Sequence, residues 1–111
     1  MIPTLEINSY EFLQPETHIM HFQIINKVFW FYSVPSELRK VKSRKRELVI
    51  ARQVSMYFVR RRCIHMSLKE IGSFFDQHHT SVLNGIKAVE DQLSIDKRFK
   101  ANLEYLENRL P

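Results

Sequence analysis

The sequence has little cysteine and little glycine. Cys63 is the only cysteine among 111 residues, so the chain cannot form an internal disulfide, which fits a reducing compartment. Gly72 and Gly85 are the only glycines, so a phosphate-binding loop of the form G-x-x-x-x-G-K-[S/T] is absent. This excludes ATP hydrolysis by that route. We expect no enzyme, no bound nucleotide and no cofactor.

Long apolar runs are also missing. The longest, around residues 28–34, is far shorter than the roughly 18 residues that a membrane span needs. The first six residues lack the basic start and the cleavage site of a signal peptide. No nucleophile motif and no distinctively spaced carboxylate pair occurs. We therefore expect a cytoplasmic, non-catalytic protein without a membrane partner.

Basic residues are plentiful, but they are unevenly placed. The chain has 17 Lys and Arg against 12 Asp and Glu, and residues 39–62 hold ten of those 17 beside a single acid. The segments on either side are slightly acidic. An even surplus of charge would indicate only solubility, whereas this concentrated segment predicts a polyanionic partner.

Apolar residues recur at helical spacing after Pro15, which predicts an all-α domain of about five to six helices. We place this domain at residues 16–111, after an N-terminal arm (residues 1–15) that is partly ordered or flexible. The bulk of Trp30 and Phe31 predicts a deeply buried first helix. Helices are expected near residues 17–32, shortly after Pro35, at 47–62, at 68–75, at 79–93, and after a cap at Ser94 or Asp96. The expected core includes Leu48, Ala51, Val54, Phe58, Leu68, Ile71, Phe75, Val82, Ile86, Val89, Leu93, Phe99, Leu103, Leu106 and Leu110.

Two of the expected helices have the spacing of a helix-turn-helix, with a turn of three or four residues. Ser67 and Glu70 form a capping-box pattern where the first helix begins. The second helix turns its apolar stripe inward and leaves polar side chains on the opposite side, where they can reach base edges in a major groove. These exposed polar residues are His79, Thr80, Ser81, Asn84 and Lys87.

Four segments make this pattern recognisable: KSRKREL (42–48), ARQVSMY (51–57), SLKEIG (67–72) and HTSVL (79–83). In order and spacing they resemble the C-terminal DNA-binding domain of DnaA, the bacterial chromosomal replication initiator. The resemblance extends from about Glu16 to the C-terminus. It implies a monomer that binds double-stranded DNA sequence-specifically, in replication or transcription control.

The resemblance also implies roles for individual residues. Arg44 corresponds to a loop arginine that enters the minor groove, where a narrow A·T-rich groove concentrates negative potential, and Lys42 to a backbone contact beside it. Further matched positions are phosphate contacts at Arg52, Gln53, Arg60 and Lys69, and base readers at His79, Thr80 and Ser81.

Two features depart from the family pattern. The family has a glycine pair and then Arg-Asp-His before the recognition helix, whereas this chain has Asp76-Gln77-His78-His79, one residue shorter. His78 replaces an aspartate that accepts from a base, and it cannot act as an anionic acceptor, but it remains among the expected DNA-binding residues. The ATPase module of intact DnaA is also absent. We therefore expect a free-standing DnaA-type domain, for instance from a phage or mobile element, or a fragment of a longer chain.

Other uses of the same residues remain as alternatives. The basic segment can meet an acidic protein partner, or it can bind RNA or single strands with Phe29-Trp30-Phe31-Tyr32 as a stacking platform. Most residues in such an aromatic run belong to a core, however. Cys63, His65, His78 and His79 contain metal-ligating side chains, but their spacing matches no standard zinc site.

Overall fold

The computed structural model describes residues 15–111, with side chains from residue 20 onward. It confirms the all-α prediction, because five α-helices and one 3-10 helix occur in this part of the chain and no strand does. The predicted N-terminal arm lies outside the described residues, except that Pro15 begins the first helix. The helices are α3 (Pro15–Phe31), η1 (Ser36–Lys40), α4 (Arg46–Arg62), α5 (Leu68–Ser73), α6 (His79–Ile95) and α7 (Lys97–Glu107).

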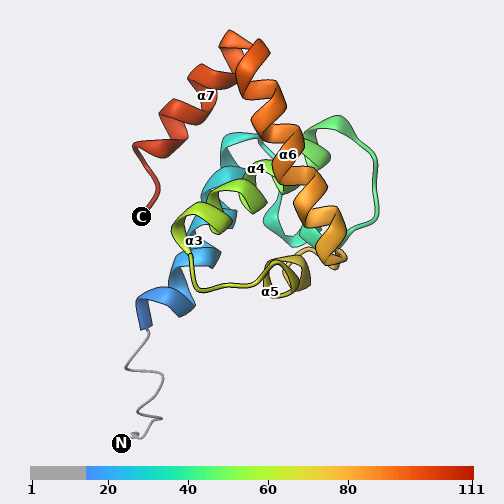
Figure 1. The fold of residues 1–111 in the computed structure, drawn as a ribbon, viewed down its shortest axis with the longest axis vertical. Coiled ribbons are helices and arrows are strands. Elements are labelled where there is room, and N and C mark those ends of the chain that lie inside the picture. Colours follow the sequence, from blue (N-terminus) through green and yellow to red (C-terminus); the bar gives the residue numbers. More distant parts are fainter. Residues whose placement is uncertain (1–14) are drawn as a thin grey trace, which may run out of the picture.

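The helix α4 is the centre of the fold, and it packs against α3, α5 and α6 (Figure 1). Its predicted apolar stripe is confirmed, since Leu48, Ala51, Val54 and Phe58 are all buried. Each large apolar side chain that is fully buried stabilises the folded chain by roughly 1.5–3 kcal/mol relative to exposure. None of the basic residues of α4 is buried, so they lie outside this stripe. The packing of the stripe against the core fixes the helix that carries them.

The helix α3 is buried on one side only. Ile24, Val28 and Phe29 are fully buried, whereas Trp30 is 64% exposed and Phe22 is 46% exposed. The prediction of a deeply buried helix is therefore wrong for these two aromatic rings. Successive side chains of a helix point about 100° apart, so one packed side cannot cover a whole run of aromatic residues.

The helices α5 and α6 form the predicted helix-turn-helix. The capping box is confirmed: Glu70 N–H donates to Ser67 Oγ over 3.1 Å, and Ser67 N–H donates to Glu70 Oε1 over 2.9 Å. The turn, residues 74–78, is longer than expected because α5 ends at Ser73. Its last turn tightens, and the amides of Phe74 and Phe75 bond to carbonyls three residues back.

The turn itself depends on a close approach of backbone to backbone. Asp76 has a left-handed φ of 54°, and Gln77 N–H donates to the carbonyl of Gly72 over 2.9 Å. A Cβ at position 72 would collide with the carbonyl oxygen of Gln77. Gly72 therefore allows the chain to fold back from α5 and to enter α6 at a fixed angle.

The helix α6 crosses α4 and leads into α7, which turns back along the molecule (Figure 1). Val82 and Val89 are buried, and Ile86 and Leu93 pack against the core. Of the two predicted caps for α7, Asp96 is the observed one, and its Oδ1 accepts from Phe99 N–H over 3.0 Å. Within residues 15–111, no helix combines the length and apolar character needed to cross a membrane.

Candidate nucleic-acid interface

Residues 41–45, which we call the basic loop, are held against α4 by Arg52. Its Nη1 donates to the carbonyl of Val41 over 2.8 Å, and its Nη2 donates to the carbonyl of Ser43 over 3.0 Å. Partial burial lowers the pKa of Arg52, but an arginine stays charged at any physiological pH. The guanidinium thus fixes the backbone beside Arg44, whose own side chain is exposed.

Lys42 joins the basic loop to the turn of the helix-turn-helix. Its Nζ donates to the backbone carbonyl of Asp76 over 2.9 Å and lies 3.5 Å from Asp76 Oδ2. Both side chains are largely exposed, so we expect this ion pair to contribute only about 0–1 kcal/mol to stability. Its effect is positional, because it connects two segments that are 34 residues apart.

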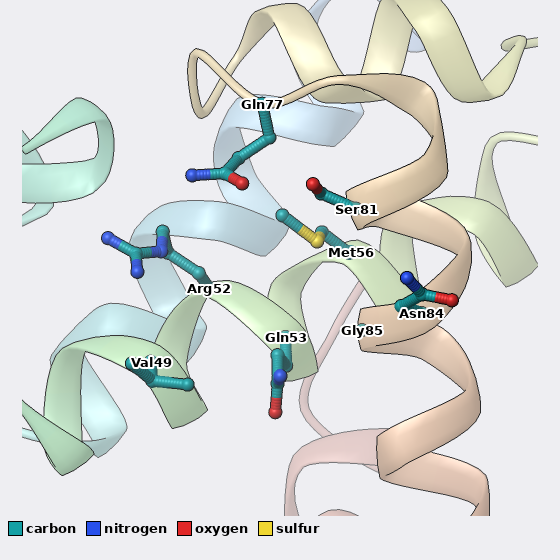
Figure 2. A pocket seen from close by; sticks show the side chains of 8 residues that line it. All are labelled: Val49, Arg52, Gln53, Met56, Gln77, Ser81, Asn84 and Gly85. Carbon is teal, nitrogen blue, oxygen red and sulfur yellow. The ribbon is translucent and has the colours of Figure 1, made fainter. Parts of the chain in front are cut away.

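A hollow of about 240 Å³ separates α4 from the first half of α6 (Figure 2). Arg52 and Gln53 line it from α4, and Ser81 and Asn84 line it from α6. The helices approach closely at Gly85, where a Cβ would lie 3.3 Å from both Gln53 Cγ and Met56 Sδ. Gln53 is therefore half-buried against α6, whereas Arg60, seven residues further along α4, is exposed.

The outer side of α6 carries the polar side chains that the sequence predicts there. Thr80, Asn84 and Lys87 are exposed, opposite the buried Val82 and Val89. Lys87 Nζ lies 3.8 Å from Asp91 Oδ1. Leu83, which is 55% exposed on the same side, is not among the functional residues predicted from the sequence. Its position three residues after Thr80 and four before Lys87 is the signal that places it there.

The leading end of α6 is formed by two neighbouring histidines. His78 is the N-cap, and its Nδ1 accepts from Thr80 N–H over 3.2 Å. The ring centroids of His78 and His79 are 4.1 Å apart. A second hollow, of about 600 Å³, opens beside them and is also lined by Lys69 of α5.

The structure thus gathers most, but not all, of the predicted residues. The first half of α4, the turn and the first half of α6 meet around the two hollows, and the basic loop is joined to them through the hydrogen bonds of Lys42 and Arg52. Gln77, which is not among the residues predicted from the sequence, lines both hollows. Arg60 lies apart, and its Nη1 donates to the carbonyl of Met66 over 3.3 Å. Among the residues that the structure describes, no three His, Cys, Asp or Glu side chains form a group that could hold a metal ion.

Comparison with known proteins agrees with this arrangement. Residues 22–89 match the family described as the bacterial dnaA protein helix-turn-helix. The chromosomal replication initiator protein DnaA of Deinococcus deserti is 31% identical over 99 residues, which cover 89% of this chain and 22% of that protein. The DnaA of Bacteroides fragilis is 40% identical over 88 residues, which cover 78% of this chain and 18% of that protein. The chain spans about a fifth of the length of these curated relatives, and it belongs to the bacterial DnaA helix-turn-helix family.

Proposed function

We propose that this chain binds double-stranded DNA sequence-specifically as a monomer, with the first half of α6 in the major groove and Arg44 in the adjacent minor groove. One observation carries the proposal. Arg52 holds the carbonyl of Ser43, next to Arg44, and its side chain lines the same hollow as Ser81 and Asn84 of α6. The basic loop and α6 therefore form one continuous surface, which we call the reading surface.

The side chains of α6 offer the chemistry that base recognition requires. The amide of Asn84 can pair with adenine, the methyl group of Thr80 can contact that of thymine, and the ammonium of Lys87 can donate to guanine or to phosphate. His79 and Ser81, both exposed near the start of α6, add further hydrogen-bonding groups. All of these side chains are exposed, so none must be uncovered before DNA binds.

Phosphate contacts surround the reading surface. We assign this role to Gln53, Arg60 and Lys69, and we assign to Lys42 and Arg52 both a positive charge near the phosphates and the placement of the basic loop. Such contacts supply affinity and register but carry no sequence information directly. We expect DNA binding by this chain to need no ATP, because these 111 residues contain no nucleotide-binding loop.

The relatives are named chromosomal replication initiator proteins. We propose by this relation that the chain acts at an origin or a regulatory site in the cytoplasmic nucleoid, in control of replication or transcription. Selection of binding sites from a random duplex library tests the proposal. A single enriched sequence, with at least about 1,000-fold tighter binding than random duplex, is the expected result. Equal affinity for all duplexes would contradict it.

A second candidate function is the binding of RNA or single-stranded DNA. Trp30 favours it, because this ring is 64% exposed and Lys27 Nζ lies 5.0 Å from its centroid. Tighter binding to single strands than to duplex, lost in Trp30→Ala, would support this function against the first.

An acidic protein partner on the basic loop is tested by competition, because duplex DNA displaces it only if both use the reading surface.

A further inference from the structure

We infer that His78 determines part of the sequence specificity by donating a hydrogen bond to a guanine in the major groove. The inference rests on the proposed function and adds to it the chemical class of base that is read at the start of α6. It also gives a positive role to the residue that departs from the family pattern.

The cap of α6 fixes which nitrogen of the imidazole carries the proton. Nδ1 of His78 accepts from the backbone N–H of Thr80 over 3.2 Å, and it lies 3.2 Å from Thr80 Oγ1. A ring nitrogen that accepts from an N–H holds no proton itself. The neutral imidazole then carries its proton on Nε2, so that Nε2 is a donor.

This donor is free to meet a ligand. His78 is exposed, and within residues 20–111 no group accepts from its Nε2. The acid nearest in sequence, Asp76, is engaged by Lys42, whose Nζ lies 3.5 Å from Asp76 Oδ2. The His79 ring, tilted by 36° with its centroid 4.1 Å away, and the contacts to Thr80 limit the orientations that the His78 ring can take.

A single donor at the start of a recognition helix favours one base in particular. In the major groove guanine presents two neighbouring acceptors, N7 and O6, with no group beside them that repels a donor. Adenine places an amino group beside its single acceptor N7, thymine places a methyl group near its single acceptor O4, and cytosine presents an amino group. An aspartate at the same position would accept, and it would therefore favour the amino group of cytosine or adenine. His78 reverses this preference while it still caps the helix.

Two substitutions separate capping from reading. His78→Asn keeps a capping oxygen and an N–H donor, whereas His78→Asp keeps the cap but replaces the donor with an acceptor. Site selection from a random duplex library is carried out with the full chain and with both variants, and Ser94→Ala, near the other end of α6, is the control. We expect the full chain, His78→Asn and the control to enrich guanine at one shared position. His78→Asp should enrich cytosine or adenine there, with the other positions unchanged.

A modified base tests the contact itself. 7-Deazaguanine at the shared position removes the N7 acceptor, and we expect it to weaken binding of the full chain by about five- to tenfold and to leave His78→Asp unaffected. The same base preference in all four proteins, or no effect of 7-deazaguanine on the full chain, would overturn the inference and leave the proposed function intact. No sequence preference in any of the four proteins would overturn both.

Discussion

Arg52 makes hydrogen bonds within the protein that compete with a direct role on DNA. The family resemblance implies a phosphate contact, and the structure instead engages Nη1 with Val41 and Nη2 with Ser43. A planar guanidinium can hold two carbonyls at fixed angles, which the ammonium of lysine cannot do. We therefore expect Arg52 to act mainly by placing Arg44.

Arg52→Lys tests this positioning role, because it keeps the charge and loses the fork geometry. We expect about tenfold weaker binding to the preferred duplex, with little further loss when Arg44→Ala is already present. A double-mutant cycle on duplex affinity measures this coupling. Arg60→Lys is the matched control, and its effect should add to that of Arg44→Ala. Additive effects for Arg52→Lys as well would show that the two arginines act independently.

Thr80 is the residue whose loss should affect specificity most cleanly. It is exposed on the outer side of α6 and close to its start. We expect Thr80→Ala to cost roughly 1–3 kcal/mol of binding free energy on the preferred duplex and almost nothing on random duplex. Titration of both duplexes measures the difference. Equal losses on the two would mean that α6 is not the recognition helix.

Single-residue detail was the least predictable from the sequence. The exposure of Thr80, Asn84 and Lys87 follows from helical period, and the structure agrees with it. The hydrogen-bond acceptors of Lys42 and Arg52 do not follow from any pattern, because they are backbone carbonyls, which every residue has. Their choice depends on how the basic loop lies against the turn, and that is a property of the folded chain.

At the scale of helices, the glycines show where two elements must approach closely. A Cβ at position 72 would meet backbone at Gln77, which cannot move without changing the turn, whereas at position 85 it would meet the flexible side chains of Gln53 and Met56. We expect Gly72→Ala to lower the free energy of unfolding by roughly 2 kcal/mol or more, and Gly85→Ala by clearly less. Urea denaturation followed by circular dichroism measures both. The reverse order would contradict the described geometry of the turn.

The cap of α7 gives a prediction for pH. The pKa of Asp96 is held below its ordinary value of 3.8, first by the backbone N–H of Phe99 and next by the side chain of Gln92. A lowered pKa in the folded state contributes stability that is present above the unfolded value and is lost as the pH falls through the folded value. We expect the stability difference between the chain and Asp96→Asn to shrink progressively below about pH 3.8. Urea midpoints from pH 7 to pH 2.5 measure it, and a difference that does not change with pH would contradict the cap.

The helices themselves were largely predictable. Capping residues and apolar spacing placed α4, α5, α6 and α7 to within a few residues. The length of the turn was not predictable from the sequence. The left-handed conformation of Asp76 and the hydrogen bond from Gln77 N–H to the carbonyl of Gly72 end α5 earlier than its apolar pattern does. The exposure of Trp30 also depends on which side of α3 meets α4, and this is decided by packing.

At the scale of the whole molecule, the uneven distribution of charge predicts how the DNA-binding constant depends on salt concentration. If about five to seven phosphates are neutralised, the logarithm of the binding constant should fall with the logarithm of salt concentration with a slope near −5 to −6. Lys69→Ala should reduce that slope by about 1. Arg109→Ala should leave it unchanged, because Arg109 lines a hollow with Gln23 and Lys27 of α3 and with no residue of the reading surface. A slope near zero for the full chain would mean that the basic segment is not the DNA contact.

Methylation protection by dimethyl sulfate tests the central claim most directly, because the reagent modifies guanine N7 in the major groove and adenine N3 in the minor groove. With the selected duplex saturated, the account predicts protection in one major groove and in the adjacent minor groove, within about one helical turn. Arg44→Ala should lose only the minor-groove protection, and Thr80→Ala should weaken only major-groove protection. Protection confined to one groove in the full chain, or loss of both together in either variant, would contradict a single reading surface made from the basic loop and α6.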